Sequence, residues 1–308
     1  MALNGIDAIT YGVADVTETN RFFADWGLRQ RSDDAAHAVF ETEDGTEVHI
    51  CRADDPALPP AFEAGSTLRE VVWGAPNEAE LAKVVAAVGG TRCTDPNGLA
   101  LSFRVSRRKP VAVSAVPINA PGDAKRIDRA APIYSRASPL GVGHYVAFVA
   151  DFAASVAFYR EKLGFHLSDQ YPGFGAFLRC QAEGGHHNLF LLSRPDKPGL
   201  NHIAYTVRDI HEVFGGGIAM AAKGWSTELG PGRHPISSAY FWYFHCPGGA
   251  SAEYYADEDY LTAAWQPRDW MRSPENFAEW AIAGGLDGKT RRQARAAPPP
   301  PTPAAVGR

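Results

Sequence analysis

The chain has 308 residues, of which 45% are hydrophobic and 21% are charged, so it is long enough for two domains with sizeable cores. Its formal net charge of −5 provides no basic surface for a polyanion, which argues against nucleic acid as a partner. It has no apolar run of about 18 residues and no basic segment followed by an apolar one at its start, so we expect neither a membrane span nor a signal peptide. The four cysteines lie far apart without CxxC spacing, which indicates reduced thiols in a cytoplasmic protein.

The first predicted unit is a strand, a helix and then further strands. The strand spans residues 9–15, and Asp15 or Thr17 caps the helix after it, which Gly27 ends. Residues 38–51 form two strand-like runs around an Asp-Gly turn, which predicts a hairpin.

The same order of elements recurs three more times. The opening strands are predicted at 69–74, 144–150 and 202–208, the helices at 78–88, 152–163 and 210–223, and the later strands at 99–105, 176–180, 187–192, 240–245 and 251–255. Asn77, Asp151 and Asp209 are the expected helix caps. The glycine run at 215–217 weakens the prediction of the last of these helices. A fourfold repeat of a unit of about 50 residues predicts two domains, each made of two paired units.

Two segments fall outside the repeat. Residues 106–138 are irregular, and we take them as the connection between the halves. Further on, Ser273 and Pro274 predict the start of a helix that ends at residues 284–285. The tryptophan-rich run from 265 to 280 is expected to pack back on the domain, in the manner of a lid.

Superposing the four units on their helix caps reveals a difference between the halves. The residues seven positions before the cap are, in chain order, Ala8, Glu70, His144 and His202. On the closing strand, Glu253 stands six residues after Pro247, where the second unit has Ser102. The C-terminal half therefore has two imidazoles and a carboxylate at equivalent positions, and the N-terminal half has no comparable set.

This ligand set has a characteristic chemistry. Two imidazoles and one carboxylate occupy one face of a metal and leave the opposite face open, which suits ferrous iron that must bind a substrate and O₂ together. Zinc is more often tetrahedral, and magnesium or calcium prefers oxygen ligands. Manganese is the alternative to iron.

The C-terminal half contains several distinctive motifs, namely Gly143-His144-Tyr145-Val146, His186-His187-Asn188-Leu189, Leu200-Asn201-His202-Ile203, Gly230-Pro231-Gly232-Arg233-His234, Tyr243 and Ala252-Glu253-Tyr254. They resemble the motifs of the vicinal oxygen chelate superfamily, which includes glyoxalases and bleomycin resistance proteins, and within it those of the type I extradiol ring-cleavage dioxygenases. The resemblance covers roughly residues 6–258.

The resemblance implies an α+β fold in which four βαβββ modules pair into two domains, each an incomplete β-barrel with helices outside. We expect an N-terminal domain without a metal site at residues 1–135. A catalytic domain with a C-terminal helix or lid is expected at 136–290, and a disordered proline-rich tail at 291–308.

The same resemblance assigns roles to six residues. The implied metal ligands are His144, His202 and Glu253, with Fe(II) as the cofactor and Mn(II) as the alternative. His187, fifteen residues before His202 and expected on a strand, corresponds to the family's acid–base histidine. His234 and Tyr243 correspond to groups that hydrogen-bond the substrate and developing oxyanions. For Tyr243, an ordinary place in the core is the competing interpretation.

The implied function is extradiol cleavage of a catechol-type aromatic diol by O₂, in the degradation of aromatic compounds. The expected partners are a small aromatic diol and O₂, without nucleic acid or membrane, in a cytoplasmic homo-oligomer. Residues 237–240 read Ser-Ser-Ala-Tyr where the family often has Ser-Asn-Ala-Phe, and no arginine precedes the Gly-Pro-Gly-Arg-His motif. A carboxylate on the substrate is thus less expected at that spot, although Arg179 or Arg233 could bind one.

Three other functions are compatible with the sequence. A redox-neutral lyase or isomerase of the superfamily usually needs a fourth protein ligand, often an acid on a closing strand, and residues 187–192 contain none. A metal-free binding module would not require the matching ligands His144, His202 and Glu253. Cleavage of a hydroquinone or aminophenol keeps the chemistry and changes only the substrate.

Overall fold

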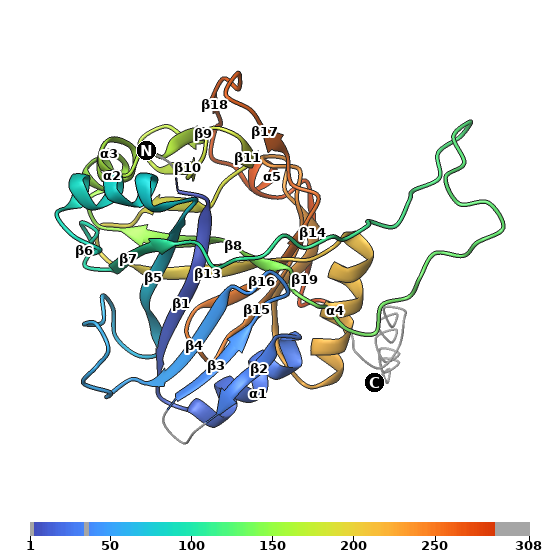
Figure 1. Cartoon of the computed structure of the whole chain (residues 1–308). Helices are drawn as coiled ribbons and strands as arrows, with labels where there is room; N and C mark the ends of the chain where they lie inside the picture. Colours follow the sequence, from blue (N-terminus) through green and yellow to red (C-terminus); the bar gives the residue numbers. More distant parts are fainter. Residues whose placement is uncertain (1–2, 34–36, 287–308) are drawn as a thin grey trace, which may run out of the picture.

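The computed structural model describes residues 3–33 and 37–286, so the predicted tail at 291–308 lies outside the described residues. In chain order, the first half contains β1 (Gly5–Val13), α1 (Val16–Trp26), β2 (Arg29–Asp33), β3 (His37–Glu41), β4 (Glu47–Arg52), β5 (Thr67–Ala75), α2 (Glu78–Val88), β6 (Arg92–Thr94) and β7 (Ala100–Val105). Residues 106–140 follow without a helix or strand, and Figure 1 shows part of this connection, in green, extending away from the sheets.

The second half has the larger set of elements. They are β8 (Gly141–Val149), α3 (Phe152–Ala157), the π-helix η1 (Phe158–Lys162), β9 (His166–Tyr171), β10 (Gly175–Arg179), β11 (Gly184–Gly185), β12 (Leu189–Ser193), β13 (Gly199–Thr206), α4 (Ile210–Ala222), β14 (Thr227–Arg233), β15 (Tyr240–His245), β16 (Ser251–Ala256), β17 (Tyr260–Leu261), β18 (Arg268–Asp269), α5 (Pro274–Phe277) and β19 (Trp280–Ala283). Within the described ranges, no helix is both long enough and apolar enough to cross a membrane.

Two open sheets dominate the fold, which confirms the α+β prediction (Figure 1). The seven-stranded sheet has the order β2-β3-β4-β1-β5-β7-β6. The ten-stranded sheet has the order β18-β9-β10-β12-β8-β13-β16-β15-β14-β19, and β11 pairs separately with β17. The sheets are curved layers with free edges and are not closed barrels.

Both sheets are built on one pairing pattern. In the first, β1 pairs antiparallel with β5 and parallel with β4, and β5 pairs parallel with β7. In the second, β8 pairs antiparallel with β13 and parallel with β12, and β13 pairs parallel with β16. The repeat in the sequence is therefore also a repeat of topology. The domain boundary at residues 135–136 stays a prediction.

The four main helices begin where their caps predict. Asp15, Asn77, Asp151 and Asp209 each accept a hydrogen bond from the backbone N–H three residues later. Such a bond satisfies a donor that the first helical turn leaves free, which is why these residues start helices. Gly27 ends α1 with a left-handed φ of 98°, a conformation that costs glycine little.

The structure corrects three predictions of secondary structure. The helix predicted at 152–163 is α-helical only to Ala157 and continues as the π-helix η1. The helix predicted to run to residues 284–285 ends at Phe277, because the chain after it pairs with β14 as strand β19. The strand predicted at 187–192 begins only at Leu189, so His187 precedes it. Pairing with distant strands overrides local preference in the second case.

The glycine run in α4 is a packing feature. A Cβ atom at Gly217 would lie 2.0 Å from the ring of Trp242, and one at Gly216 would lie 2.6 Å from the Cβ of Ala137. A side chain at either position would push the helix away from the sheet. The close approach of α4 to β15 and to the connecting segment thus explains residues that weaken the helix when judged by propensity alone.

One hydrophobic core runs through both halves. Trp26 at the end of α1 stacks on Tyr254 of β16, with 3.6 Å between ring centroids and 11° between planes. The Tyr254 hydroxyl donates a hydrogen bond to the Trp26 carbonyl oxygen at 2.7 Å. The N-terminal half therefore packs directly behind the strand that carries Glu253.

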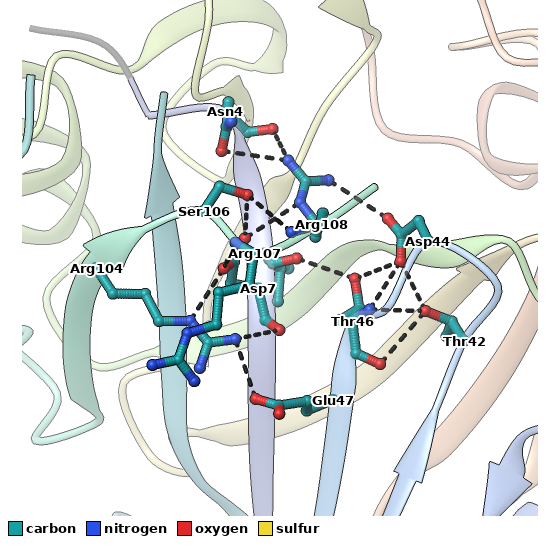
Figure 2. Close-up of polar contacts among 11 residues, drawn as sticks. Asn4, Asp7, Thr42, Asp44, Thr46, Glu47, Arg104, Ser106, Arg107 and Arg108 are labelled. Carbon is teal, nitrogen blue, oxygen red and sulfur yellow. Dashed lines mark hydrogen bonds and ion pairs between the residues drawn. The ribbon is translucent and has the colours of Figure 1, made fainter. Parts of the chain in front are cut away.

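A buried aspartate fastens the start of the connecting segment to the first sheet (Figure 2). Asp7 on β1 is fully buried and accepts hydrogen bonds from the Ser106 hydroxyl at 2.6 Å and the Arg107 backbone N–H at 2.8 Å. It also pairs with Nε of Arg104 at 3.0 Å and with Nε of Arg108 at 3.2 Å. Because a buried carboxylate needs such compensation, the network fixes where the chain leaves the N-terminal half.

Replacing Asp7 with alanine should lower the free energy of unfolding by about 3 kcal/mol, because it leaves two arginines and two further donors without their acceptor. Urea denaturation followed by circular dichroism measures this difference. The matched control is Asp54→Ala, which removes an ion pair to Arg52 whose side chains are 58% and 71% exposed and should leave the midpoint unchanged. Equal midpoints for wild type and Asp7→Ala would contradict the anchoring role.

Candidate metal centre

Three adjacent strands of the ten-stranded sheet bring the predicted ligands together. His144 lies on β8, His202 on β13 and Glu253 on β16, and β13 is the middle strand. Ala204 of β13 pairs with His144 on one side and with Glu253 on the other. Because side chains alternate along a strand, His202, two residues from Ala204, projects on the same face as these neighbours. The small Ala204 leaves room between the larger side chains.

The ligand atoms form a nearly regular triangle. Oε2 of Glu253 lies 3.3 Å from Nε2 of His144 and 3.1 Å from Nε2 of His202, and the two Nε2 atoms are 3.4 Å apart. Ligands at about 2.1 Å from one ion are separated by about 3.0 Å at right angles and about 3.4 Å in a tetrahedron. All three separations therefore match ligands of a single ion.

The polar atoms of the triad also fit a cation. Among the described residues, Oε2 of Glu253 and Nδ1 of His144 are buried without a hydrogen-bond partner of proper geometry. Nδ1 of His202 donates to Oδ1 of Asn201 at 2.6 Å, which leaves its Nε2 lone pair directed at the triad. Burial alone would raise the pKa of Glu253, but the two histidines outweigh it and hold that pKa below its ordinary range. Burial lowers the pKa of His144, so a neutral imidazole faces an ionised carboxylate, as metal binding requires.

His187 lies beside the triad. Its ring centroid is 4.0 Å from that of His144, and the side chain is buried. Its Nδ1 lies 3.2 Å from Nδ1 of His186. Burial, followed by the neighbouring histidines, moves the pKa of His187 well below its ordinary value. The neutral ring is therefore the form present near neutral pH.

His234 and Tyr243 form a second polar pair at the site. His234 follows β14, and its Nδ1–H donates to the carbonyl oxygen of Phe277 at 2.6 Å. Its Nε2 then accepts the hydroxyl of Tyr243 at 3.0 Å. Tyr243 pairs across β15 and β16 with Glu253. Burial lowers the pKa of His234 to about 4 and raises that of Tyr243 well above its usual value.

All six predicted site residues line one cavity of about 790 Å³. Most of its remaining wall is apolar or aromatic and includes Val146, Tyr171, Phe174, Phe177, Phe190, Leu192, Ile236, Ala239 and Phe277. The rings of Phe177 and Phe190 stack with 3.7 Å between centroids. Residues 272–274 and 277 also line the cavity, so the C-terminal segment packs back on the domain over the site.

Three charged residues that the sequence does not single out also line the cavity, namely Glu228, Glu258 and Arg272. The guanidinium of Arg272 lies 3.5 Å from the centroid of the Phe174 ring. By contrast, Arg179 and Arg233 are not among the lining residues: Arg179 bonds the carbonyl oxygen of Leu167, and Arg233 pairs with Glu279. Neither arginine therefore lies at the cavity wall, where it could meet a substrate carboxylate. No local motif marks Arg272, because its place depends on how the C-terminal segment folds back.

The position in the N-terminal half that corresponds to the triad holds different residues. Oε1 of Glu70 accepts the hydroxyl of Ser102 at 2.5 Å and pairs with Nη2 of Arg92 at 3.0 Å. Ala8 offers only a methyl group. An ion pair thus fills the place that the triad occupies in the C-terminal half.

Comparisons with known proteins place this site in a family. Residues 141–254 match the model of the Glyoxalase/Bleomycin resistance protein/Dioxygenase superfamily. Metapyrocatechase 2 of Cupriavidus necator is 34% identical over 147 residues, which are 47% of this chain and 45% of that protein. An iron-dependent extradiol dioxygenase of Rhodococcus jostii is 28% identical over 131 residues, covering 37% of this chain and 42% of that protein. The matched region thus spans less than half the length of these curated relatives.

Solved structures resemble the chain over most of its length. The Mn(II)-bound glyoxalase of Novosphingobium aromaticivorans has a TM-score of 0.73 and 26% identity, covering 92% of this chain and 93% of that one. A 2,3-dioxygenase of Pseudomonas sp. KL28 has a TM-score of 0.69 and 17% identity, covering 88% and 98%, which shows a shared fold. Residues 141–254 therefore form a domain of the glyoxalase/bleomycin resistance protein/dioxygenase superfamily, and the named relatives of the chain include extradiol dioxygenases.

Proposed function

We propose that the chain is an extradiol dioxygenase, which opens the ring of a catechol-type aromatic diol with O₂ at a mononuclear Fe(II) site held by His144, His202 and Glu253. The observation that carries the proposal is the triad itself, a buried two-histidine, one-carboxylate set at the wall of a large apolar cavity. Similarity to a metapyrocatechase and to an iron-dependent extradiol dioxygenase supports it. Ferrous iron would supply adjacent open positions for a diol and O₂ and would lower the pKa of the diol hydroxyls.

The side chains around the triad have separate roles in the proposed reaction. Nδ1 of His187 is engaged with His186, so Nε2 is the nitrogen that can take a proton from a diol hydroxyl and later return it. Its lowered pKa keeps it neutral and ready to accept. Tyr243 and His234 lie on another wall and offer polar contacts to the substrate oxygens.

The apolar walls orient the ring and exclude water. Stacked Phe177 and Phe190 give a flat surface of the kind that binds an aromatic ring. Because the C-terminal segment covers the cavity and accepts the Nδ1–H of His234 through the Phe277 carbonyl, its docking completes the site. A cavity of about 790 Å³ leaves room for a ring substituent beside the diol.

The sequence and the proposed chemistry indicate a cellular compartment and the substrates. The cysteines lie far apart along the chain and have no CxxC spacing, which favours a cytoplasmic enzyme. The proposed substrates are a small aromatic diol and O₂. A homo-oligomeric state stays a prediction.

One alternative has an observation in its favour. The similarity to a Mn(II)-bound glyoxalase at 26% identity fits a redox-neutral lyase or isomerase that uses manganese. Against it, the ligand group found among the described residues contains only His144, His202 and Glu253. Strand β12, which would have to supply an additional acid, reads Leu-Phe-Leu-Leu-Ser.

The first test is oxygen consumption. Protein loaded with Fe(II) under anaerobic conditions and then given O₂ with a panel of simple, alkyl and aryl catechols should consume one O₂ per diol and form a coloured ring-opened product. With isotopically labelled O₂, mass spectrometry should find both oxygen atoms in the product, whereas chelated protein should show no uptake. A product isomeric with its substrate would favour the alternative, and no product from the whole panel would overturn the proposal.

The second test separates metal binding from proton transfer. His202→Ala should lose iron while keeping its circular dichroism spectrum, because it removes one of three ligands on a stable sheet. His187→Phe should keep iron and lower kcat by about 10²–10⁴-fold, because it removes the acid–base group. Metal analysis and oxygen uptake measure both. His245→Ala, at an exposed strand end, is the control and should behave as wild type. Iron loss from His187→Phe would instead make His187 a ligand.

A further inference from the structure

Three buried side chains connect the wall of the cavity to the C-terminal segment. Nδ1 of His187 lies 3.2 Å from Nδ1 of His186, and Nε2 of His186 lies 3.2 Å from Oδ2 of Asp169. His186 and Asp169 are fully buried, and neither lines the cavity.

Asp169 is an ionised acceptor. It receives the backbone N–H of Arg268 at 2.7 Å and the indole N–H of Trp270 at 3.2 Å, and it pairs with the Arg268 guanidinium at 2.5 Å. Burial would raise the pKa of Asp169, yet hydrogen bonds from His186 and Arg268 lower it. Since a carboxylate only accepts, Nε2 of His186 must carry the proton in their hydrogen bond.

The charges around His186 bear on how many protons its ring carries. Arg268 already compensates the carboxylate, so a proton on both nitrogens of His186 would place an uncompensated charge in a fully buried position beside other histidines. A single proton on His186, placed on Nε2 toward Asp169, leaves its Nδ1 as an acceptor. The hydrogen on the 3.2 Å contact belongs to Nδ1 of His187.

We infer that Asp169 and His186 are positioning residues that fix the tautomer of His187, with the proton on Nδ1 and the lone pair on Nε2. The inference rests on the proposed function and deepens it, because it says why His187 would present a base, rather than a second donor, to a diol hydroxyl. Glu258, which lines the cavity, also supports the backbone at His186 by accepting its N–H at 3.1 Å.

The hydrogen-bonded chain from His187 through His186 to Asp169 continues into the C-terminal segment. Arg268 and Trp270 precede the residues from 272 to 277 that line the cavity, and β18 pairs with β9 through Arg268 and Asp169. The contacts that dock this segment are thus the contacts that keep Asp169 ionised.

The direct test is NMR of the full-length, metal-free protein with isotope-labelled histidine, which reads tautomers without any turnover. Wild type should show His187 protonated at Nδ1 and His186 at Nε2. In His186→Phe, which removes the acceptor, His187 should lose this preference. A wild-type His187 protonated at Nε2 would overturn the inference whatever the activity of the enzyme.

Steady-state kinetics provide a second test of the inference. In the iron-loaded enzyme, His186→Phe and Asp169→Asn should lower kcat for a catechol by about 10–100-fold, with little change in KM or iron content. Added imidazole should restore part of kcat to His186→Gly. The control is Asp269→Asn, which alters the same strand through its bond to Gln170 and should leave kcat unchanged. Wild-type kcat in both Asp169→Asn and His186→Phe would overturn the inference, whereas a wild type inactive on all diols would overturn the proposed function and leave the NMR result standing.

Discussion

The pairing of β8, β13 and β16 is the constraint on which the site depends. Ala204 meets His144 on one side and Glu253 on the other, and register fixes all three ligands on one face. A slip of one residue in either ladder would turn a ligand to the opposite face. The buried carboxylate would then lose its histidines, which is a large cost for an ionised group. Strand register and ligand geometry therefore stabilise one another.

Much of the fold was predictable because its signals are local. The caps Asp15, Asn77, Asp151 and Asp209 use hydrogen bonds within three residues, and each begins a helix where predicted. The triad was predictable for another reason. The repeat supplies an internal comparison, in which Ala8 and Ser102 show the same positions without ligands, and the structure brings the predicted three together.

What escaped prediction depends on contacts between distant segments. Strand β19 forms because residues after Phe277 reach the edge of β14, although the local pattern favours a longer helix. Arg272 and Glu258 line the cavity only because the chain after β16 folds back over it. No local pattern marks Asp169, because its partners His186 and Arg268 lie far along the chain.

The stacking of Trp26 on Tyr254 gives the half without ligands a part in the chemistry of the other half. Tyr254 is the residue next to Glu253, so α1 braces the strand that holds the carboxylate. Because the two halves share one core, we expect them to unfold together. Any ion that binds only the folded triad must then protect the N-terminal sheet from unfolding as well, although no ligand comes from it.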